Sequence, residues 1–284
     1  MSGLRKLVAA ELAEPVDPKI ASMAAAIAAV HGDASRAVLF YGSCLREKHL
    51  DGLMLDFYLI VSNYRAAYPK RWMATANRLV PPNVFPFHHQ GLAAKYAVLS
   101  EADFDRLNGP GTRNVSVWAR FAQPSRLVWA SDDPARARAI DAIAKAAPTL
   151  LGAAGRLGGE DLLDWWRRAF ALTYSSELRA ERKGRSQSMV DSDPERYRQF
   201  GEAAAELTGS NAGHWRRPRI EGKMLSVLRL AKASATYAGG ADYIAWKINR
   251  HAGTKFELNP WQKRHPLLAA ISLLPRLLKS GAIR

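Results

Sequence analysis

The sequence contains very little cysteine, with Cys44 as the only one in 284 residues. A single cysteine excludes an internal disulfide and any zinc site built on cysteines. No histidine stands at a catalytic spacing from Cys44, so we expect a small, semi-buried side chain there and not a nucleophile. The adjacent histidines His88 and His89 do not indicate a metal site, because neighbouring side chains point apart and no third ligand is near.

Long apolar runs are also missing. The Ala-rich segment 20–30 is far shorter than the ~20 residues that a membrane-spanning helix needs. Near the start of the chain, Glu11, Glu14 and Asp17 stand among apolar residues, which argues against a signal peptide or an acid-poor transit peptide. We therefore expect a cytoplasmic protein.

Acidic residues are scarce in the last quarter of the chain. From His214 to Arg284 there are 14 Lys/Arg against 3 Asp/Glu, whereas the first 213 residues carry 27 against 23. Most of the net charge of +15 therefore belongs to the C-terminal segment. Such a basic segment indicates phosphate-rich partners, namely nucleic acid, nucleotide or anionic lipid.

Two neighbouring apolar segments carry the residues that indicate chemistry. Residues 37–40 predict a short buried strand that ends at Tyr41-Gly42-Ser43. Residues 53–61 predict a second strand, with one wholly apolar face for the core and the face of Asp56 for chemistry. A Gly-Ser turn offers N–H groups and a hydroxyl to a triphosphate, and an aspartate on the next strand can hold magnesium. This pattern is typical of a nucleotidyltransferase, which mostly positions phosphates and neutralises their charge.

The acids depart from the usual pattern of such enzymes. Polymerase-β-type transferases carry Asp-x-Asp or Asp-x-Glu on one strand face, and here Tyr58 stands at the second position. The second metal ligand must then come from elsewhere, or magnesium keeps more waters and substrate oxygens. Asp51 is a candidate ligand or a solvated loop acid. A carboxylate in an apolar strand needs a partner, and for Asp56 a magnesium ion, a backbone cap or an arginine would each serve.

Capping residues and breakers divide the first half of the chain. Asp17-Pro18 predicts a helix that runs to about Val30. Residues 64–79 predict a helix interrupted at Pro69, and residues 95–99 predict another strand.

The second half begins with a helix that Asp133-Pro134 starts and Pro148 stops. Glycines between residues 152 and 159 mark a flexible boundary. Residues 161–174 predict a helix with Trp165, Trp166 and Phe170 in a packed core. We therefore expect three parts, which are listed by residue number: 1–150, 151–213 and 214–284.

Further short stretches follow the Gly-Ser motif in a fixed order. They are Asn77-Arg78-Leu79, the strand from Lys95 to Ser100, the run from Trp118 through Arg120 to Pro124, Tyr174-Ser175-Ser176-Glu177-Leu178-Arg179, and more loosely residues 243–247. In this order they resemble the mitochondrial-type CDP-diacylglycerol synthases, or phosphatidate cytidylyltransferases. Glu177 stands where that family has aspartate, and Cys44 stands where it has a small residue.

The resemblance implies an α+β fold in three parts. A polymerase-β-like nucleotidyltransferase mixed sheet would be followed by a helical, winged-helix-like domain and a basic C-terminal region that contacts a membrane. The implied activity is Mg²⁺-dependent transfer of CMP from CTP to phosphatidic acid, which gives CDP-diacylglycerol and pyrophosphate for phospholipid synthesis.

The resemblance also implies roles for single residues. The phosphates of CTP would meet the turn and three cations: Tyr41, Gly42, Ser43, Lys95, Arg120 and Arg179. Asp56 would bind magnesium and, with Ser43, act in catalysis, while Lys247 would meet the acceptor phosphate. Each of the four cations is also explained as a solvated surface charge.

The tail fits a lipid substrate for a separate reason. His265-Pro266 precedes a leucine-rich segment edged by Arg264, Arg276 and Lys279. About 13 helical residues span ~20 Å, too short for the ~30 Å hydrocarbon core. Such a segment can lie in the interface of an anionic membrane, or it can dock on the protein core. We expect a cytoplasmic protein that associates peripherally with the inner face of a membrane.

Two other functions use the same features. A nucleotidyltransferase acting on RNA or on a protein hydroxyl would use the same site and bind RNA through the basic tail. The sequence shows no basic surface interleaved with aromatic residues, so nucleic acid is the less expected partner. A degenerate transferase that tethers something to a membrane would explain the missing second carboxylate.

Overall fold

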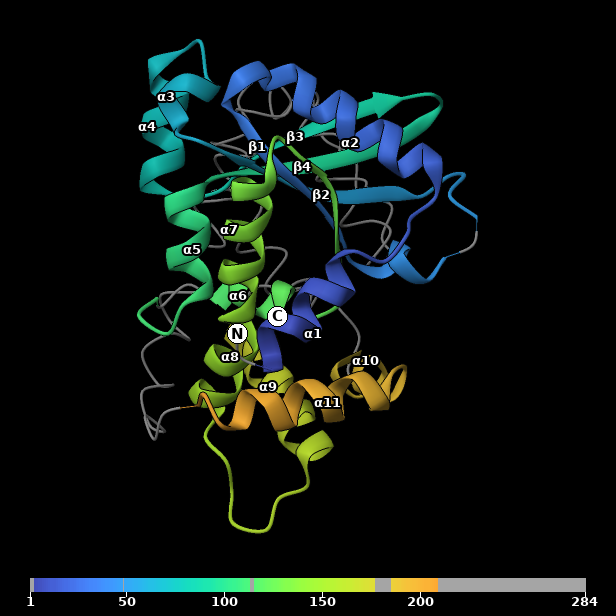
Figure 1. Cartoon of the computed structure of the whole chain (residues 1–284), viewed down its shortest axis with the longest axis vertical. Coiled ribbons are helices and arrows are strands. Elements are labelled where there is room, and N and C mark those ends of the chain that lie inside the picture. Colours follow the sequence, from blue (N-terminus) through green and yellow to red (C-terminus); the bar gives the residue numbers. More distant parts are fainter. Residues whose placement is uncertain (1–2, 48, 113–114, 177–184, 209–284) are drawn as a thin grey trace, which may run out of the picture.

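The computed structural model describes residues 3–47, 49–112, 115–176 and 185–208. Within them the protein is an α+β structure around one mixed sheet, which agrees with the α+β class and the mixed sheet expected from the sequence (Figure 1). The strands are β1 (Ser35–Tyr41), β2 (Met54–Val61), β3 (Asn83–His89), β4 (Leu92–Ser100) and β5 (Ser125–Ala130). The helices before β5 are α1 (Gly3–Leu12), α2 (Pro18–His31), η1 (Gly32–Ala34), η2 (Ser43–Arg46), α3 (Tyr64–Ala67), α4 (Arg71–Leu79), α5 (Glu101–Asn108) and α6 (Val115–Phe121). Those after it are α7 (Asp133–Ala144), α8 (Ala146–Ala154), α9 (Leu162–Ser176), α10 (Arg185–Asp191) and α11 (Pro194–Ala205).

The strands of this sheet lie in the order β3-β4-β2-β1-β5. β2 and β4 are parallel, and the other neighbours are antiparallel. The sequence predicted β1, β2 and β4 correctly as strands and missed β3 and β5. Because β2 and β4 are parallel, their starts lie at the same edge of the sheet, and the end of β1 lies there too.

Helices cover both faces of the sheet. One face carries Phe57 and packs against α2, whose Met23 is fully buried. The other face carries Tyr58 and Ile60, which lie in a core shared with α1 and with α5 to α9. This second face was expected to carry chemistry, but along most of β2 it belongs to the core, because Tyr58 and Ile60 are each only 2% exposed. Only the start of the strand, around Asp56, remains half-buried.

The predicted helix starts are confirmed by their caps. The Asp17 side chain accepts a hydrogen bond from the backbone N–H of Lys19 at 2.8 Å, and Pro18 is the first residue of α2. In α7 the cap is Asp132, which accepts from the backbone N–H of Ala135 at 2.7 Å. An N-cap side chain satisfies one of the helix's first N–H groups, which otherwise have no partner within the helix.

The predicted stop of this second helix at Pro148 is wrong. α7 ends at Ala144, and Pro148 is the third residue of α8. A proline in the first turn of a helix removes no intrahelical hydrogen bond, because the N–H groups there have no partner within the helix. The residue therefore belongs to the start of a helix and not to the end of one.

The helices α8 to α11 lie in the lower part of Figure 1, below the sheet. Trp165, Trp166 and Phe170 of α9 are 2%, 0% and 0% exposed, which confirms the predicted packed helix. The indole N–H of Trp166 donates to the backbone oxygen of Tyr197 on α11 at 2.8 Å. One core cluster contains both Leu39 of the sheet and residues of these helices. Residue 150, where the sequence placed a boundary, lies inside α8.

A buried ion pair joins α1 to α11. The guanidinium of Arg196 donates from Nη2 to Glu11 Oε1 at 3.1 Å and from Nε to Glu11 Oε2. Its Nη1 donates to the backbone oxygen of Ala122 at 3.2 Å, and its carbon lies 4.2 Å from the ring centroid of Phe200. The two charged side chains are only 7% and 9% exposed, so this pair depends on both partners being present.

The predicted basic region 214–284 and the end of the predicted helical domain at residue 213 lie outside the described residues. In the part of the chain that the structure covers, no helix combines the length and the apolar composition needed to cross a membrane.

Candidate functional site

Three neighbouring strands bring three of the predicted site residues into one row. Asp56 on β2 pairs with Tyr41 at the end of β1 and with Lys95 near the start of β4. Residues paired across adjacent strands place their side chains on the same face of the sheet. The row formed by Tyr41, Asp56 and Lys95 therefore lies at the end of the sheet where β1 finishes and where β2 and β4 begin.

The turn after β1 brings the backbone against Asp56. Gly42 has φ of +95° and ψ of −166°, a conformation that is essentially restricted to glycine. A Cβ placed on Gly42 would lie 3.4 Å from Asp56 Oδ2. The lack of a side chain at this position therefore leaves space beside one carboxylate oxygen.

The other oxygen of Asp56 binds Lys95. The Lys95 ammonium lies 3.0 Å from Asp56 Oδ1, and the two side chains are 26% and 22% exposed. The sequence suggested magnesium, a backbone cap or an arginine as the partner of Asp56. In the structure a cationic side chain binds Asp56, but it is a lysine and not an arginine. The negative charge of Asp56 and the positive charge of Lys95 cancel, so the row has no net charge. Oδ2 of Asp56 lies on the side of the turn at Gly42.

The residues after Gly42 form the short helix η2. Ser43 is exposed at its start, and Cys44 is only 6% exposed, so this thiol is buried more deeply than the semi-buried position expected for it. Cys44 Sγ lies 3.6 Å from the backbone oxygen of Met54 and fastens the turn to the start of β2. Burial raises the pKa of the Cys44 thiol, and the negative charge of Asp56 raises that pKa further, which makes Cys44 a poor nucleophile at neutral pH.

A cluster of aromatic side chains packs beside the row. The ring of Tyr58 lies 5.3 Å from that of Tyr41 and 5.2 Å from that of Phe121 on α6. Tyr58 occupies the position of the second acid in the usual transferase motif, and its packing accounts for the aromatic residue there. Phe121 was not predicted as part of the site, since only the folded chain brings α6 to β2.

Of the remaining predicted site residues, one lies on α6 and two lie outside the described part of the chain. Arg120 is half-buried on α6 and donates from Nη1 to the backbone oxygen of Ser116, one turn earlier. It is next to Phe121 in sequence, and because Phe121 packs against Tyr58 of β2, α6 lies near the row. Arg179 and Lys247 lie outside the described residues.

Asn77, which belongs to the stretch that resembles the synthase family, has a structural position. It is fully buried, donates to the backbone oxygen of Val98 at 2.9 Å and accepts from the backbone N–H of Asn83. These bonds hold the first residue of β3 in place, beside the end of β4 that is farther from Asp56. Asn77 therefore does not belong to the site.

The row offers too few ligands to hold a magnesium ion by itself. It could bind the ion together with a nucleotide, whose phosphates would supply further ligands. Among the described residues, no cluster of three or more His, Cys, Asp or Glu side chains is arranged to hold a metal ion. Asp51, the other predicted candidate ligand, is exposed in the turn before β2. Magnesium is often bound by one or two carboxylates with substrate phosphates supplying further ligands, and Asp56 Oδ2 can serve as the single carboxylate ligand in such a site.

The arrangement as a whole offers a glycine backbone, one carboxylate and one ammonium at a half-open sheet edge. These groups suit the phosphates of a nucleotide. Comparison of the sequence with protein-family models and with curated proteins finds no match.

Proposed function

We propose that this protein is a nucleotidyltransferase that uses CTP and Mg²⁺ to convert phosphatidic acid to CDP-diacylglycerol and pyrophosphate. One observation carries the proposal: the side-chain-free backbone of Gly42 lies beside Asp56 Oδ2, while Asp56 Oδ1 binds Lys95. A phosphate chain could lie along such a turn, because its oxygens need N–H donors, a metal ligand and a positive charge within a few ångströms.

The order of elements around the turn supports the proposal. A helix (α2) leads into β1, the turn leads into the antiparallel β2 with its acid, and helices α3 and α4 then lead towards β4, which is parallel to β2. This is the arrangement expected of a polymerase-β-like transferase, with β3 added at the edge. The sequence resemblance to phosphatidate cytidylyltransferases follows the same strands.

Lys95 offers an explanation for the missing second acid. Two-metal sites use several carboxylates to hold two divalent ions beside the phosphates. Here Tyr58 fills the position of the second acid on β2, and the neighbouring strand places Lys95, a cation, beside Asp56 instead of a further carboxylate. We therefore expect one Mg²⁺, held by Asp56, with the ammonium of Lys95 supplying the other positive charge.

Phosphatidic acid suits a site of this composition. Its phosphate is already ionised, so it attacks the α-phosphorus of CTP without a general base, whereas a hydroxyl acceptor has a proton to lose. The bond that forms joins an acceptor phosphate oxygen to the α-phosphorus, and the bond that breaks releases pyrophosphate. Peripheral association with the inner face of a membrane would bring the protein to this lipid.

The first test is a transferase assay with phosphatidic acid vesicles, CTP and Mg²⁺, in which CDP-diacylglycerol and pyrophosphate are both measured. Asp56→Asn should abolish both products because it removes the metal ligand. Asp51→Asn is the matched control, since this acid is exposed in the preceding turn and should retain activity. Equal loss in both variants, or none in either, would contradict the assignment of Asp56.

Binding measurements separate the nucleotide site from the acceptor. Manganese can replace magnesium in an electron paramagnetic resonance titration with a CTP analogue whose α,β-bridge cannot be cleaved. We expect one bound ion per chain in the wild-type protein, and nucleotide affinity reduced about 10- to 100-fold in Lys95→Met through loss of a charge-assisted contact. Nucleotide binding without lipid product would shift the proposal to RNA or a protein hydroxyl as acceptor, and no nucleotide binding would favour a non-catalytic tether.

A further inference from the structure

A second charged surface lies on α3 and α4, away from the row of Asp56. We call it the α4 surface, and its exposed members are Arg65, Lys70, Arg71, Trp72, Arg78 and Leu79. Residues 57–100 contain five Lys/Arg and no Asp or Glu. The α4 surface is therefore built from the longest acid-free stretch of the described part of the chain.

The periodicity of α4 places four of these residues in two rows along the helix, one apolar and one basic. Residues seven apart lie on nearly the same side of an α-helix, since seven residues make about two turns. Trp72 and Leu79 therefore form an apolar row, and Arg71 and Arg78 form a basic row about 100° away around the helix axis. Trp72 is 50% exposed and Leu79 is 73% exposed, and these are two of the five exposed large apolar side chains among the described residues.

The cations of the α4 surface have no acidic partners among the residues that the structure describes. No described residue forms an ion pair with Arg65, Lys70, Arg71 or Arg78. Within the described part of the chain, no ion pair therefore compensates these four positive charges.

The acids of the neighbouring helix α5 are engaged elsewhere. Glu101 binds Arg36 and Arg138, and Asp105 binds Lys145. Asp103 accepts from the Tyr64 hydroxyl of α3 at 2.6 Å and also binds Arg106 of its own helix. The positive potential of the α4 surface is therefore not cancelled from this side.

We propose that the α4 surface binds the surface of an anionic lipid bilayer, with Trp72 and Leu79 inserted at the level of the headgroups. A helix with an apolar row beside a basic row has the composition of an interfacial segment. Tryptophan favours the membrane–water interface, and each Lys or Arg near an anionic surface contributes about 1 kcal/mol.

Charge decides among the possible occupants of this surface. The segment 214–284 has an excess of 11 positive charges, and a second copy of this chain would present the same cations, so both would be repelled. A nucleic acid would satisfy the arginines but would leave Leu79 without a partner. An anionic bilayer offers negative headgroups to Arg71 and Arg78 and an apolar layer to Trp72 and Leu79.

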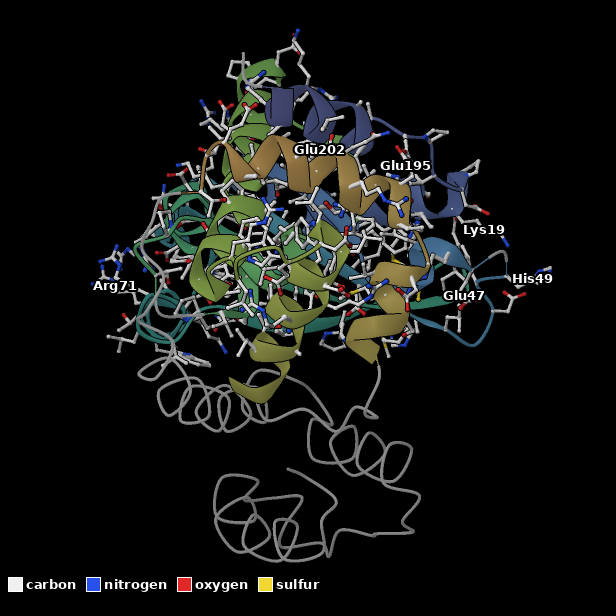
Figure 2. All side chains as sticks on the ribbon, turned by 90° about the horizontal axis from the view of Figure 1, so that it is seen from below. Lys19, Glu47, His49, Arg71, Glu195 and Glu202 are labelled. Atoms are coloured by element: carbon white, nitrogen blue, oxygen red, sulfur yellow. The ribbon has the colours of Figure 1, made fainter. Side chains whose placement is uncertain are left out.

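This inference is independent of the chemistry proposed at Asp56. From Asp56, β2 continues to Val61 before α3 begins, and this part of the strand is about 17 Å long at ~3.3 Å per residue. In Figure 2 Arg71 stands at one edge of the molecule, and Glu47 and His49, which follow the Gly-Ser turn, stand at the opposite edge. The α4 surface would attach the protein to a membrane and does not form the nucleotide site.

Local fluorescence tests the contact directly. The only cysteine, Cys44, can be replaced by serine so that a single new cysteine carries an environment-sensitive dye. Leu79→Cys places the dye on the α4 surface, and Leu157→Cys places it on an exposed apolar position outside that surface. The full chain is then mixed with vesicles of phosphatidylcholine alone, or with vesicles that also contain phosphatidylglycerol and a spin-labelled lipid as quencher.

We expect the dye at residue 79, but not the dye at residue 157, to shift to the blue and to be quenched when the vesicles contain phosphatidylglycerol. Arg71→Gln with Arg78→Gln should weaken vesicle binding about fivefold for each charge removed, or about thirtyfold together. Lys19→Gln with Arg136→Gln is the matched control, because both are exposed cations elsewhere, and it should bind like the parent. Vesicle binding with an unquenched dye at residue 79 would overturn the proposal, and so would a failure to bind anionic vesicles.

Discussion

Replacement of Gly42 by alanine separates the backbone strain of the turn from its role in binding a nucleotide. Gly42 adopts φ of +95° and ψ of −166°, where a non-glycine residue costs about 1–3 kcal/mol of folding free energy. At 3.4 Å from Asp56 Oδ2, the added methyl group would be in ordinary contact with the carboxylate and would not displace it. It would instead fill the space that we assign to the phosphates.

We therefore expect Gly42→Ala to lower the free energy of unfolding by about 1–3 kcal/mol and also to lower nucleotide affinity. Loss of one or more charge-assisted contacts, at about 1.5–3 kcal/mol each, corresponds to a decrease of about 10- to 100-fold or more. Urea unfolding measures the first effect, and calorimetric titration with the non-cleavable CTP analogue measures the second.

Gly32→Ala provides the control for strain. Gly32 also has a positive φ, +51°, and lies before the start of β1, at the end of that strand opposite to Gly42, where a Cβ would meet nothing within 4 Å. Both variants should lose stability, but only Gly42→Ala should lose nucleotide affinity. Wild-type nucleotide affinity in a folded Gly42→Ala protein would refute the assignment of this turn to the phosphates.

Three further predictions concern buried groups. Arg196→Met should lower the free energy of unfolding by about 3–5 kcal/mol, because it leaves the Glu11 carboxylate buried without a partner, and adding Glu11→Leu should restore most of it; an additive double variant in urea unfolding would contradict this. Burial lowers the pKa of His31, so the unfolded chain takes up protons first and stability should fall as the pH drops below the ordinary value of about 6.5. His31→Phe should flatten this dependence between about pH 7 and pH 5 in the same unfolding assay, and an unchanged slope would show that other groups cause it. Finally, Cys44 should react with a thiol reagent much more slowly in the native protein than in urea, since burial raises the pKa of its thiol; equal rates would show that the start of β2 is open.

The features that local sequence predicts well are those with local causes. The helix α2 begins where a capping aspartate precedes a proline, and β1 and β2 are recognisable from short apolar or alternating runs. The Gly-Ser turn between the two strands was predicted for the same reason. In each case neighbouring residues supply both the signal and the interaction that stabilises the element.

The features that sequence missed depend on contacts between distant residues. The face of Tyr58 was expected to carry chemistry, but α6 packs against it, and no property of β2 alone indicates this. Lys95 was expected at a phosphate, and its pairing with Asp56 follows from the parallel register of β2 and β4. Pro148 was misread as a helix stop because proline is compatible with the first turn of a helix as well as with the residues after its end.

The ion pair between Glu11 and Arg196 has a consequence for how the chain folds during synthesis. The two residues are 185 positions apart, so α1 leaves the ribosome long before its partner on α11 exists. Until then the face of the sheet that carries Tyr58 lacks part of its cover, and the Glu11 carboxylate has no guanidinium to bind. Nascent chains that end before residue 196 should therefore expose apolar surface and depend on chaperones, and protection should appear in one step once α11 emerges.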